Sequence, residues 1–182
     1  MHNYKSKSNL SDPVEFFKKL GIRVTISVLI AFLIAYLIKF VFFFPFTVQN
    51  DFMAPEIKKD KTIYLTHLFQ KDKILIGDIV LVRINENQVL LGRVMGRKGD
   101  RISIKNKKLY RNGNFIQESS DKIQFTDKRS PFASSFSKRD NLDEVLVKDK
   151  TYFLLVDNRD DGIDSRQIGL ISQDSIIGKL LF

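Results

Sequence analysis

The sequence predicts a mostly β domain that is tethered by one N-terminal transmembrane helix. Two observations lead to this prediction. An uninterrupted apolar run occupies residues 22–44, and the chain after it consists of short β-rich runs separated by turn residues. After the apolar run, no amphipathic helical period is long enough for a strand–helix–strand unit. The 182 residues therefore suit one domain and an anchor.

The apolar run is long enough to cross a membrane. At about 1.5 Å per residue it would form a helix roughly 35 Å long, which exceeds the thickness of the hydrocarbon core. Its two charged residues, Arg23 and Lys39, lie close enough to its ends to reach the interface. Because Pro45 follows and ends the helix, we predict a transmembrane helix over residues 22–45. The length of the run and the Phe-Pro-Phe after it argue against a cleaved signal peptide.

The distribution of charge predicts how the chain is oriented. Residues 1–21 form a basic tail, which the positive-inside rule assigns to the cytoplasm. Residues 46–182 are then an extracytoplasmic domain of a single-pass protein in the cytoplasmic (inner) membrane. Lys58, Lys59 and Lys61 argue weakly for the reverse, but a long trailing domain is translocated largely regardless of its charge.

Charge and cysteine content exclude some classes of function. The net charge is +9, but outside the tail no block of like charges stands out. A solvated basic surface explains this better than a nucleic-acid site, so no nucleic-acid partner is expected. The chain has no cysteine, which excludes disulfides and cysteine-based metal or nucleophile chemistry.

Short runs rich in β-branched and apolar residues predict the strands of the domain. Hairpin turns are expected at residues 85–88, 106–107 and 112–113. The polar, serine-rich stretch 117–148 is expected to form an inserted loop or a small subdomain. The predicted strands are residues 62–65, 79–84, 89–95, 101–104, 108–110, 151–156 and 175–181.

Four segments after the apolar run carry a resemblance to a known family. They read F-T-V-Q-N-D-F-M-A-P-E-I at 46–57, G-D-I-V-L-V at 77–82, G-R-V-M-G-R-K-G-D at 92–100 and V-D-N-R-D-D-G-I-D-S-R at 156–166. In this order after a transmembrane helix, they resemble the type I signal peptidase family. Members of that family are Ser/Lys serine endopeptidases that remove signal peptides from exported preproteins at the outer membrane face. The resemblance implies a signal-peptidase-like β domain.

The positions that match the family's catalytic residues lack catalytic side chains in this chain. By resemblance, the nucleophile position is Phe52 and the position of the lysine base is Gly92. The oxyanion position is Asn50, and the serine that orients the lysine falls on Gly162. A phenyl ring and a hydrogen atom can neither attack a carbonyl nor accept a proton. The resemblance therefore predicts a member that is catalytically inactive.

Neighbouring residues offer few replacements for the missing groups. No serine lies near the position of the lost nucleophile. Arg93 cannot act as a base, because a guanidinium does not lose its proton at accessible pH. Asp51 and Asp157 are the one carboxylate pair that could activate water. His2 is expected on the other side of the membrane, and no serine accompanies His67 in its segment.

The resemblance also implies structural roles for other residues. The expected walls of the substrate groove are Val48, Met53, Ile57, Leu90 and Leu91. Phe52 would fill or cap the pocket that normally takes a small residue. Structural ion pairs are expected between Arg93 and Asp157 and between Asp164 and Arg166. The acidic residues of this segment do not fit the spacing of an EF-hand loop, so neither a metal nor a cofactor is expected.

Three functional hypotheses follow. The leading one is an inactive signal peptidase I homologue at the outer face of the cytoplasmic membrane that acts by binding. Its partners would be the lipid bilayer and preprotein signal peptides, an active signal peptidase or another membrane protein. The alternatives are an active signal peptidase I with displaced catalytic residues and a basic membrane-tethered binding module.

Overall fold

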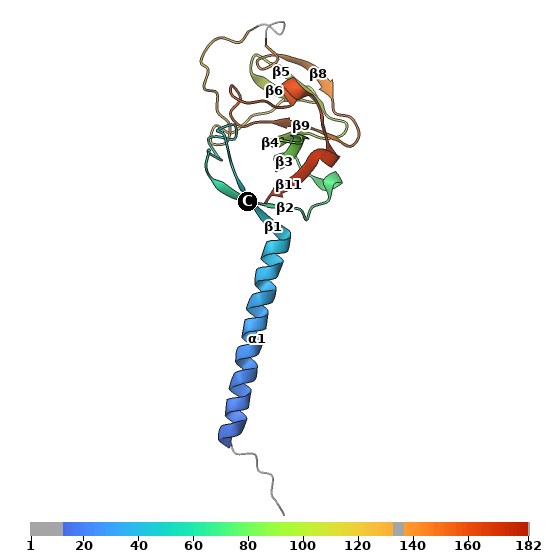
Figure 1. Cartoon of the computed structure of the whole chain (residues 1–182). Helices are drawn as coiled ribbons and strands as arrows, with labels where there is room; N and C mark the ends of the chain where they lie inside the picture. Colours follow the sequence, from blue (N-terminus) through green and yellow to red (C-terminus); the bar gives the residue numbers. More distant parts are fainter. Residues whose placement is uncertain (1–12, 133–136, 182) are drawn as a thin grey trace, which may run out of the picture. The chain divides into compact units, whose positions relative to one another are not determined.

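The chain divides into two units, Met1–Val41 and Phe42–Phe182. The computed structural model describes residues 13–132 and 137–181, so most of the predicted cytoplasmic tail, with His2, lies outside the described residues. The first unit contributes a long helix, and the second is a β domain (Figure 1).

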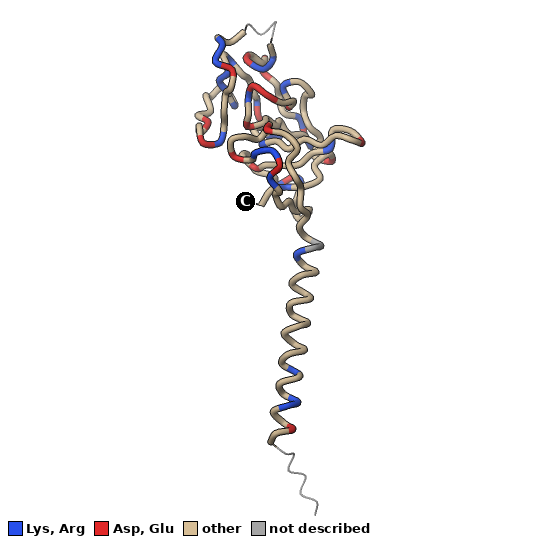
Figure 2. Tube along the Cα trace, turned by 60° about the vertical axis from the view of Figure 1, so that its left-hand side comes forward, with Lys and Arg blue, Asp and Glu red and all other residues tan. Residues whose placement is uncertain are grey.

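The helix α1 comprises Pro13–Phe42. Within the described part of the chain it is the one helix long and apolar enough to span a membrane. No charged residue lies between Arg23 and Lys39 (Figure 2). The hydroxyl of Ser27 donates to the Arg23 carbonyl oxygen at 2.9 Å, which satisfies this polar group within the helix itself.

Both ends of α1 differ from the predicted helix over residues 22–45. The helix begins earlier, at Pro13, because proline is tolerated in a first turn where its missing N–H has no partner to lose. It ends at Phe42 instead of Pro45, because Phe43–Thr47 forms strand β1. This edge strand tolerates Pro45, whose missing N–H removes no bond from a sheet interior.

The β domain contains two antiparallel sheets. The larger has the strand order β1-β2-β11-β3-β4-β9-β10, and the smaller has the order β7-β6-β5-β8. A short helix α2, Ser165–Ile168, and two 3-10 turns, Lys71–Lys73 and Gln173–Ser175, lie between strands. The strands are β1 Phe43–Thr47, β2 Thr62–Thr66, β3 Ile79–Asn85, β4 Gln88–Gly96, β5 Arg101–Lys105, β6 Lys108–Arg111, β7 Asn114–Phe115, β8 Leu142–Leu146, β9 Thr151–Leu155, β10 Ile171–Ser172 and β11 Ile176–Leu180.

The mostly β fold class is confirmed. Every predicted strand matches one of β2, β3, β4, β5, β6, β9 and β11 with ends that differ by at most one residue. Sequence reasoning missed β1, β7, β8 and β10. Strand β8 lies inside the stretch predicted as a loop or subdomain, and its Asp143 and Glu144 are exposed on an edge strand. Its pairing with β5, which a local pattern does not reveal, makes it a strand.

Two hydrophobic clusters form the core, and β9 contributes to both. Tyr152 and Leu154 belong to the first cluster, whose other members lie mainly on strands of the larger sheet. Phe153 and Leu155 belong to the second, which also contains Ile102 and Val147. Successive side chains of a strand point to opposite faces, so β9 is buried on both sides.

Gly96 at the end of β4 is expected to tolerate no side chain. A Cβ at this position would lie 2.8 Å from Ile102 Cγ1 and 3.1 Å from Val147 Cγ2, inside the second cluster. Gly96→Ala should therefore lower the free energy of unfolding by about 1–3 kcal/mol through overpacking. Urea unfolding of the solubilised chain, followed by tyrosine fluorescence, measures this. Gly21→Ala, which meets nothing within 4 Å, is the matched control.

Candidate functional site

The segment between β1 and β2 holds Phe52 in a fixed turn. Asn50 Oδ1 accepts the Phe52 amide at 3.2 Å, and the Phe52 carbonyl oxygen accepts the Asn158 amide at 2.9 Å. The next residue, Met53, anchors the turn in the core with 1% of its surface exposed. The main chain of Phe52 is thereby tied both to its own turn and to the segment after β9.

The ring of Phe52 lies directly over Gly162. A Cβ built on Gly162 would be 2.8 Å from Cγ of Phe52, which is closer than real carbon contacts allow. Gly162 also has φ +113°, in the region that favours glycine. The phenyl ring thus fills the space in which a serine side chain at position 162 would lie.

The other two positions that resemble catalytic ones have different surroundings. Gly92 lies in β4 opposite Val80, and an added Cβ would meet Leu154 Cβ at 3.4 Å, an ordinary contact. Packing therefore leaves room for the first carbon of a side chain at Gly92. Asn50 is exposed and uses its carbonyl oxygen within the turn, on the Phe52 amide.

A cavity of about 360 Å³, which we call the Phe52 cavity, opens beside this ring. Its walls come from the turn at Phe52, the β3–β4 hairpin and the segment around α2. The apolar lining residues are Phe52, Ile84, Val89, Leu90, Ile163 and Ile168. The polar lining residues are Gln49, Asn87 and Gln88, so among residues 13–132 and 137–181 no hydroxyl, amine, imidazole or carboxylate lines the cavity.

All five expected groove walls are buried residues of one core cluster, and two of them also line a cavity. Leu90 lines the Phe52 cavity, and Ile57 lines a second cavity of about 350 Å³. Val48, Met53 and Leu91 are buried in the core of the larger sheet. Their role as walls of one substrate groove stays a prediction. Sequence reasoning missed Ile84, Val89, Ile163 and Ile168, whose exposure depends on tertiary structure.

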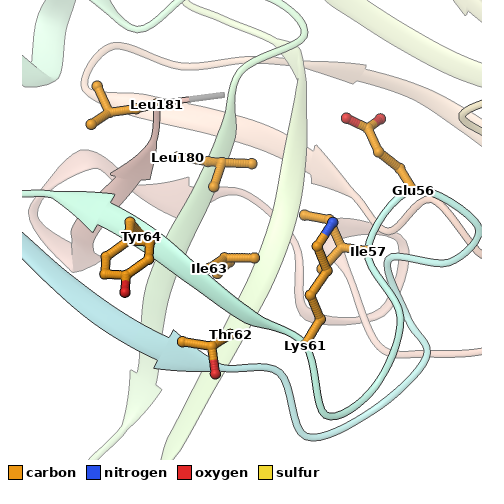
Figure 3. Close-up of a pocket in the computed structure, with 8 residues that line it drawn as sticks. All are labelled: Glu56, Ile57, Lys61, Thr62, Ile63, Tyr64, Leu180 and Leu181. Atoms are coloured by element: carbon orange, nitrogen blue, oxygen red, sulfur yellow. The ribbon is translucent and has the colours of Figure 1, made fainter.

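The second cavity contains a lysine and a hydroxyl, the residue types of a displaced dyad. Lys61 and Thr62 both line it, together with Glu56 (Figure 3). Figure 3 shows the Thr62 hydroxyl directed away from the Lys61 amine, as expected of neighbours at the start of a strand. The Thr62 oxygen lies 3.3 Å from the Thr47 hydroxyl on β1 instead. These two residues therefore do not form a nucleophile and its base.

The structure brings Arg93 and Asp157 together in a buried ion pair. Arg93 Nε donates to Asp157 Oδ1 at 2.8 Å, and Nη2 donates to Oδ2 at 2.6 Å. Nη2 also donates to Glu56 Oε2 at 2.8 Å, and Nη1 donates to the Gly77 carbonyl oxygen at 2.9 Å. The guanidinium thus joins β4 to the turn after Phe52, to the turn before β3 and to the segment after β9.

Burial controls the protonation of this pair. It raises the pKa of the Asp157 carboxyl, and the Arg93 guanidinium opposes that rise. Burial alone would lower the pKa of Arg93, but the hydrogen bond and charge of Asp157 outweigh it and raise that pKa. Because a guanidinium keeps its proton at accessible pH, Asp157 depends on Arg93 for its negative charge.

Asp164 and Arg166 are also together, at the start of α2. Arg166 Nε and Nη2 donate to the two Asp164 carboxylate oxygens at 2.9 and 2.8 Å. Asp164 caps the helix, because its carboxylate accepts a hydrogen bond from the Arg166 amide. In turn, the Gln167 side-chain oxygen accepts a hydrogen bond from the Asp164 amide at 3.0 Å. This capping box fixes the segment that places Ile163 and Ile168 at the cavity.

The remaining candidates are not brought into one site. Asp51 is exposed and accepts the Lys59 amide at 2.9 Å, whereas Asp157 is fully buried against Arg93. The two carboxylates therefore do not share a water. His67 stacks on Phe44 at 4.3 Å, and its Nδ1 lies 3.0 Å from the Ile177 carbonyl oxygen. Within the described ranges, no three His, Asp or Glu side chains gather as metal ligands would.

The chain is similar to signal peptidases over most of its length. A model of the signal peptidase family, peptidase S26, matches residues 21–182. Signal peptidase IB of Staphylococcus aureus is 28% identical over 144 residues, which cover 76% of this chain and 75% of that protein. Signal peptidase I of Bacillus amyloliquefaciens is 27% identical over 141 residues, with 77% and 75% covered. The crystal structure of a signal peptidase I from Enterococcus faecalis has 25% identity and a TM-score of 0.44, covering 60% of this chain and 97% of that one.

Breaking the buried ion pair is expected to cost far more stability than breaking an exposed one. Arg93→Met leaves Asp157 buried without its counter-charge and should lower the free energy of unfolding by about 3–5 kcal/mol. The control is Arg101→Met, which removes an exposed pair with Glu144 and should cost under about 1 kcal/mol. Urea unfolding compares the two, and equal costs would contradict this account of Arg93.

The contact between Phe52 and Gly162 predicts that substitutions at these positions are coupled. Gly162→Ser alone should destabilise the chain by about 1–3 kcal/mol more than it does in a Phe52→Ser background, because the smaller residue removes the overlap. Strain from the positive φ is present in both backgrounds and cancels in the comparison. A double-mutant cycle of unfolding free energies measures the coupling. Additive effects would show that the ring does not occupy this space.

Proposed function

Because this chain belongs to the peptidase S26 family of signal peptidases, we propose that it is a catalytically inactive signal peptidase I homologue that acts by binding a polypeptide segment. Its partners are preprotein signal peptides, an active signal peptidase or another membrane protein. Residues 1–21 lie in the cytoplasm, and the β domain acts at the outer face of the cytoplasmic membrane. The apolar helix α1 and the basic tail before it support this placement.

The lining of the Phe52 cavity carries the proposal. Peptide hydrolysis through an acyl-enzyme needs a nucleophile and a base within hydrogen-bond reach of each other. The residues around the cavity are aliphatic, aromatic or amide side chains, and none of them is a nucleophile or a base at neutral pH. No side chain among these lining residues replaces the serine and the lysine of the family's reaction.

The hairpin beside the cavity supports a binding role. Strand β4 pairs with β3 from Gln88 to Arg93, whereas its pairing with β9 begins at Arg93. Among the described strands, the outer part of β4 therefore has no partner on the side away from β3, and its residues Gln88, Val89 and Leu90 line the cavity. Addition of a strand to a sheet edge is a common way to bind a peptide without sequence-specific chemistry.

The two alternatives place other demands on the structure. An active peptidase with displaced residues would need a dyad, and the Thr62 hydroxyl is directed to Thr47 instead of Lys61. A basic binding module would need a surface on which positive charges gather without acidic neighbours. Acidic and basic residues are interspersed along the β domain (Figure 2).

Cleavage of a preprotein by the full chain in lipid nanodiscs tests the proposal. We expect no cleavage above the rate in empty nanodiscs. The variant with Phe52→Ser, Gly92→Lys and Gly162→Ser should gain cleavage, because it restores the groups that the resemblance assigns to the reaction. Processing by the unaltered chain that Asp51→Ala abolishes would contradict the proposal and favour displaced catalytic residues.

A further inference from the structure

The Phe52 cavity exposes an unusual amount of aliphatic surface. Ile163 is 57% exposed, Val89 is 43% exposed, and Ile84 and Ile168 are each 38% exposed. All four side chains line the same cavity, on two separate segments of the chain. Single exposed aliphatic residues are ordinary on a protein surface, but a concave cluster of them marks a binding site.

The Phe52 ring sets the shape of this site. It lines the cavity and occupies the space above Gly162, so this wall of the cavity is an aromatic surface. A methyl side chain from a ligand would bury little area against such a surface. A branched aliphatic side chain would contact both the ring and the aliphatic walls, and hydrophobic stabilisation grows with the area removed from water.

The polar groups of the cavity are neutral. Gln49, Asn87 and Gln88 carry amides, which both donate and accept hydrogen bonds and so match the groups of a peptide backbone. In the part of the chain that the structure describes, no charged residue lines the cavity. A charged ligand side chain would lose its hydration there without gaining a counter-charge, which is costly.

We propose that the Phe52 cavity selects extended, uncharged polypeptide segments by a bulky aliphatic side chain that packs against the Phe52 ring. Segments with a small or a charged residue at that position bind weakly. The inference rests on the proposed function and names the class of segment that the inactive site binds. Phe52 is then a specificity-determining residue of a binding site.

Binding of short fluorescein-labelled peptides tests this inference. The peptides have threonine at alternate positions and leucine, alanine or glutamate between them, and they are titrated with the full chain in lipid nanodiscs by fluorescence polarisation. Empty nanodiscs correct for partition into lipid. We expect the leucine peptide to bind about tenfold more tightly than the alanine peptide, and the glutamate peptide to bind no better than the alanine peptide.

Two lysine substitutions distinguish binding of the peptide at the cavity from binding at other exposed aliphatic surface. Ile163→Lys should weaken binding of the leucine peptide about tenfold, because it places a charge in the cavity. Leu75→Lys is the matched control, since Leu75 is also 57% exposed but does not line the cavity, and it should leave binding unchanged. Unfolding curves for both variants show whether each is folded.

The outcomes distinguish this inference from the proposed function. Equal affinity for the leucine and alanine peptides, or equal losses in Ile163→Lys and Leu75→Lys, would overturn the inference and leave catalytic inactivity standing. Mass spectrometry of the peptides after titration detects cleavage. Cleaved peptide would overturn the proposed function instead.

Discussion

The buried guanidinium of Arg93 organises the part of the β domain that surrounds Phe52. Its hydrogen bonds reach Asp157 after β9, Glu56 in the turn after Phe52 and the Gly77 carbonyl before β3. Because a buried charge is tolerated only when it is paired, these segments are constrained to meet at one point. The frame of an active site is therefore maintained by an interaction that takes no part in its chemistry. The arrangement therefore does not depend on the side chains at positions 52, 92 and 162.

Two of the altered positions, Phe52 and Gly162, are linked by packing, and the third, Gly92, is not. Phe52 could not lie where it does above a side chain at position 162, since even a Cβ there would be 2.8 Å from the ring. Gly162 and Phe52 thus complement each other sterically, as residues of a packed core do. At Gly92, by contrast, the neighbouring Leu154 leaves room for a Cβ, and the structure gives no packing reason for glycine. The ring gives the Phe52 cavity an apolar surface at the position that matches the family's nucleophile, as the proposed binding role requires.

The sequence revealed the strands with a clear alternation and the four segments shared with the family, because both signals are local. It did not reveal β1, since Phe43–Thr47 continues the apolar run and contains Pro45, which indicated only the end of a helix. The altered residues at 52, 92 and 162 could be identified by alignment with the family segments. The contact between Phe52 and Gly162 could not, because it joins distant parts of the chain. The burial of Val48, Met53 and Leu91 and the exposure of Ile163 likewise depend on tertiary packing.

The central claim is that a recognisable signal peptidase domain has become a binding domain without a nucleophile. Its most direct test is the intact mass of the full chain after incubation with a lactam acylating agent, with an active signal peptidase treated in parallel to show that the agent is competent. A lactam of this kind forms a lasting adduct only with an activated nucleophile. The account predicts that the mass of this chain is unchanged while the active enzyme gains the mass of the agent. A stoichiometric adduct on this chain would contradict it, and the modified residue would identify the nucleophile.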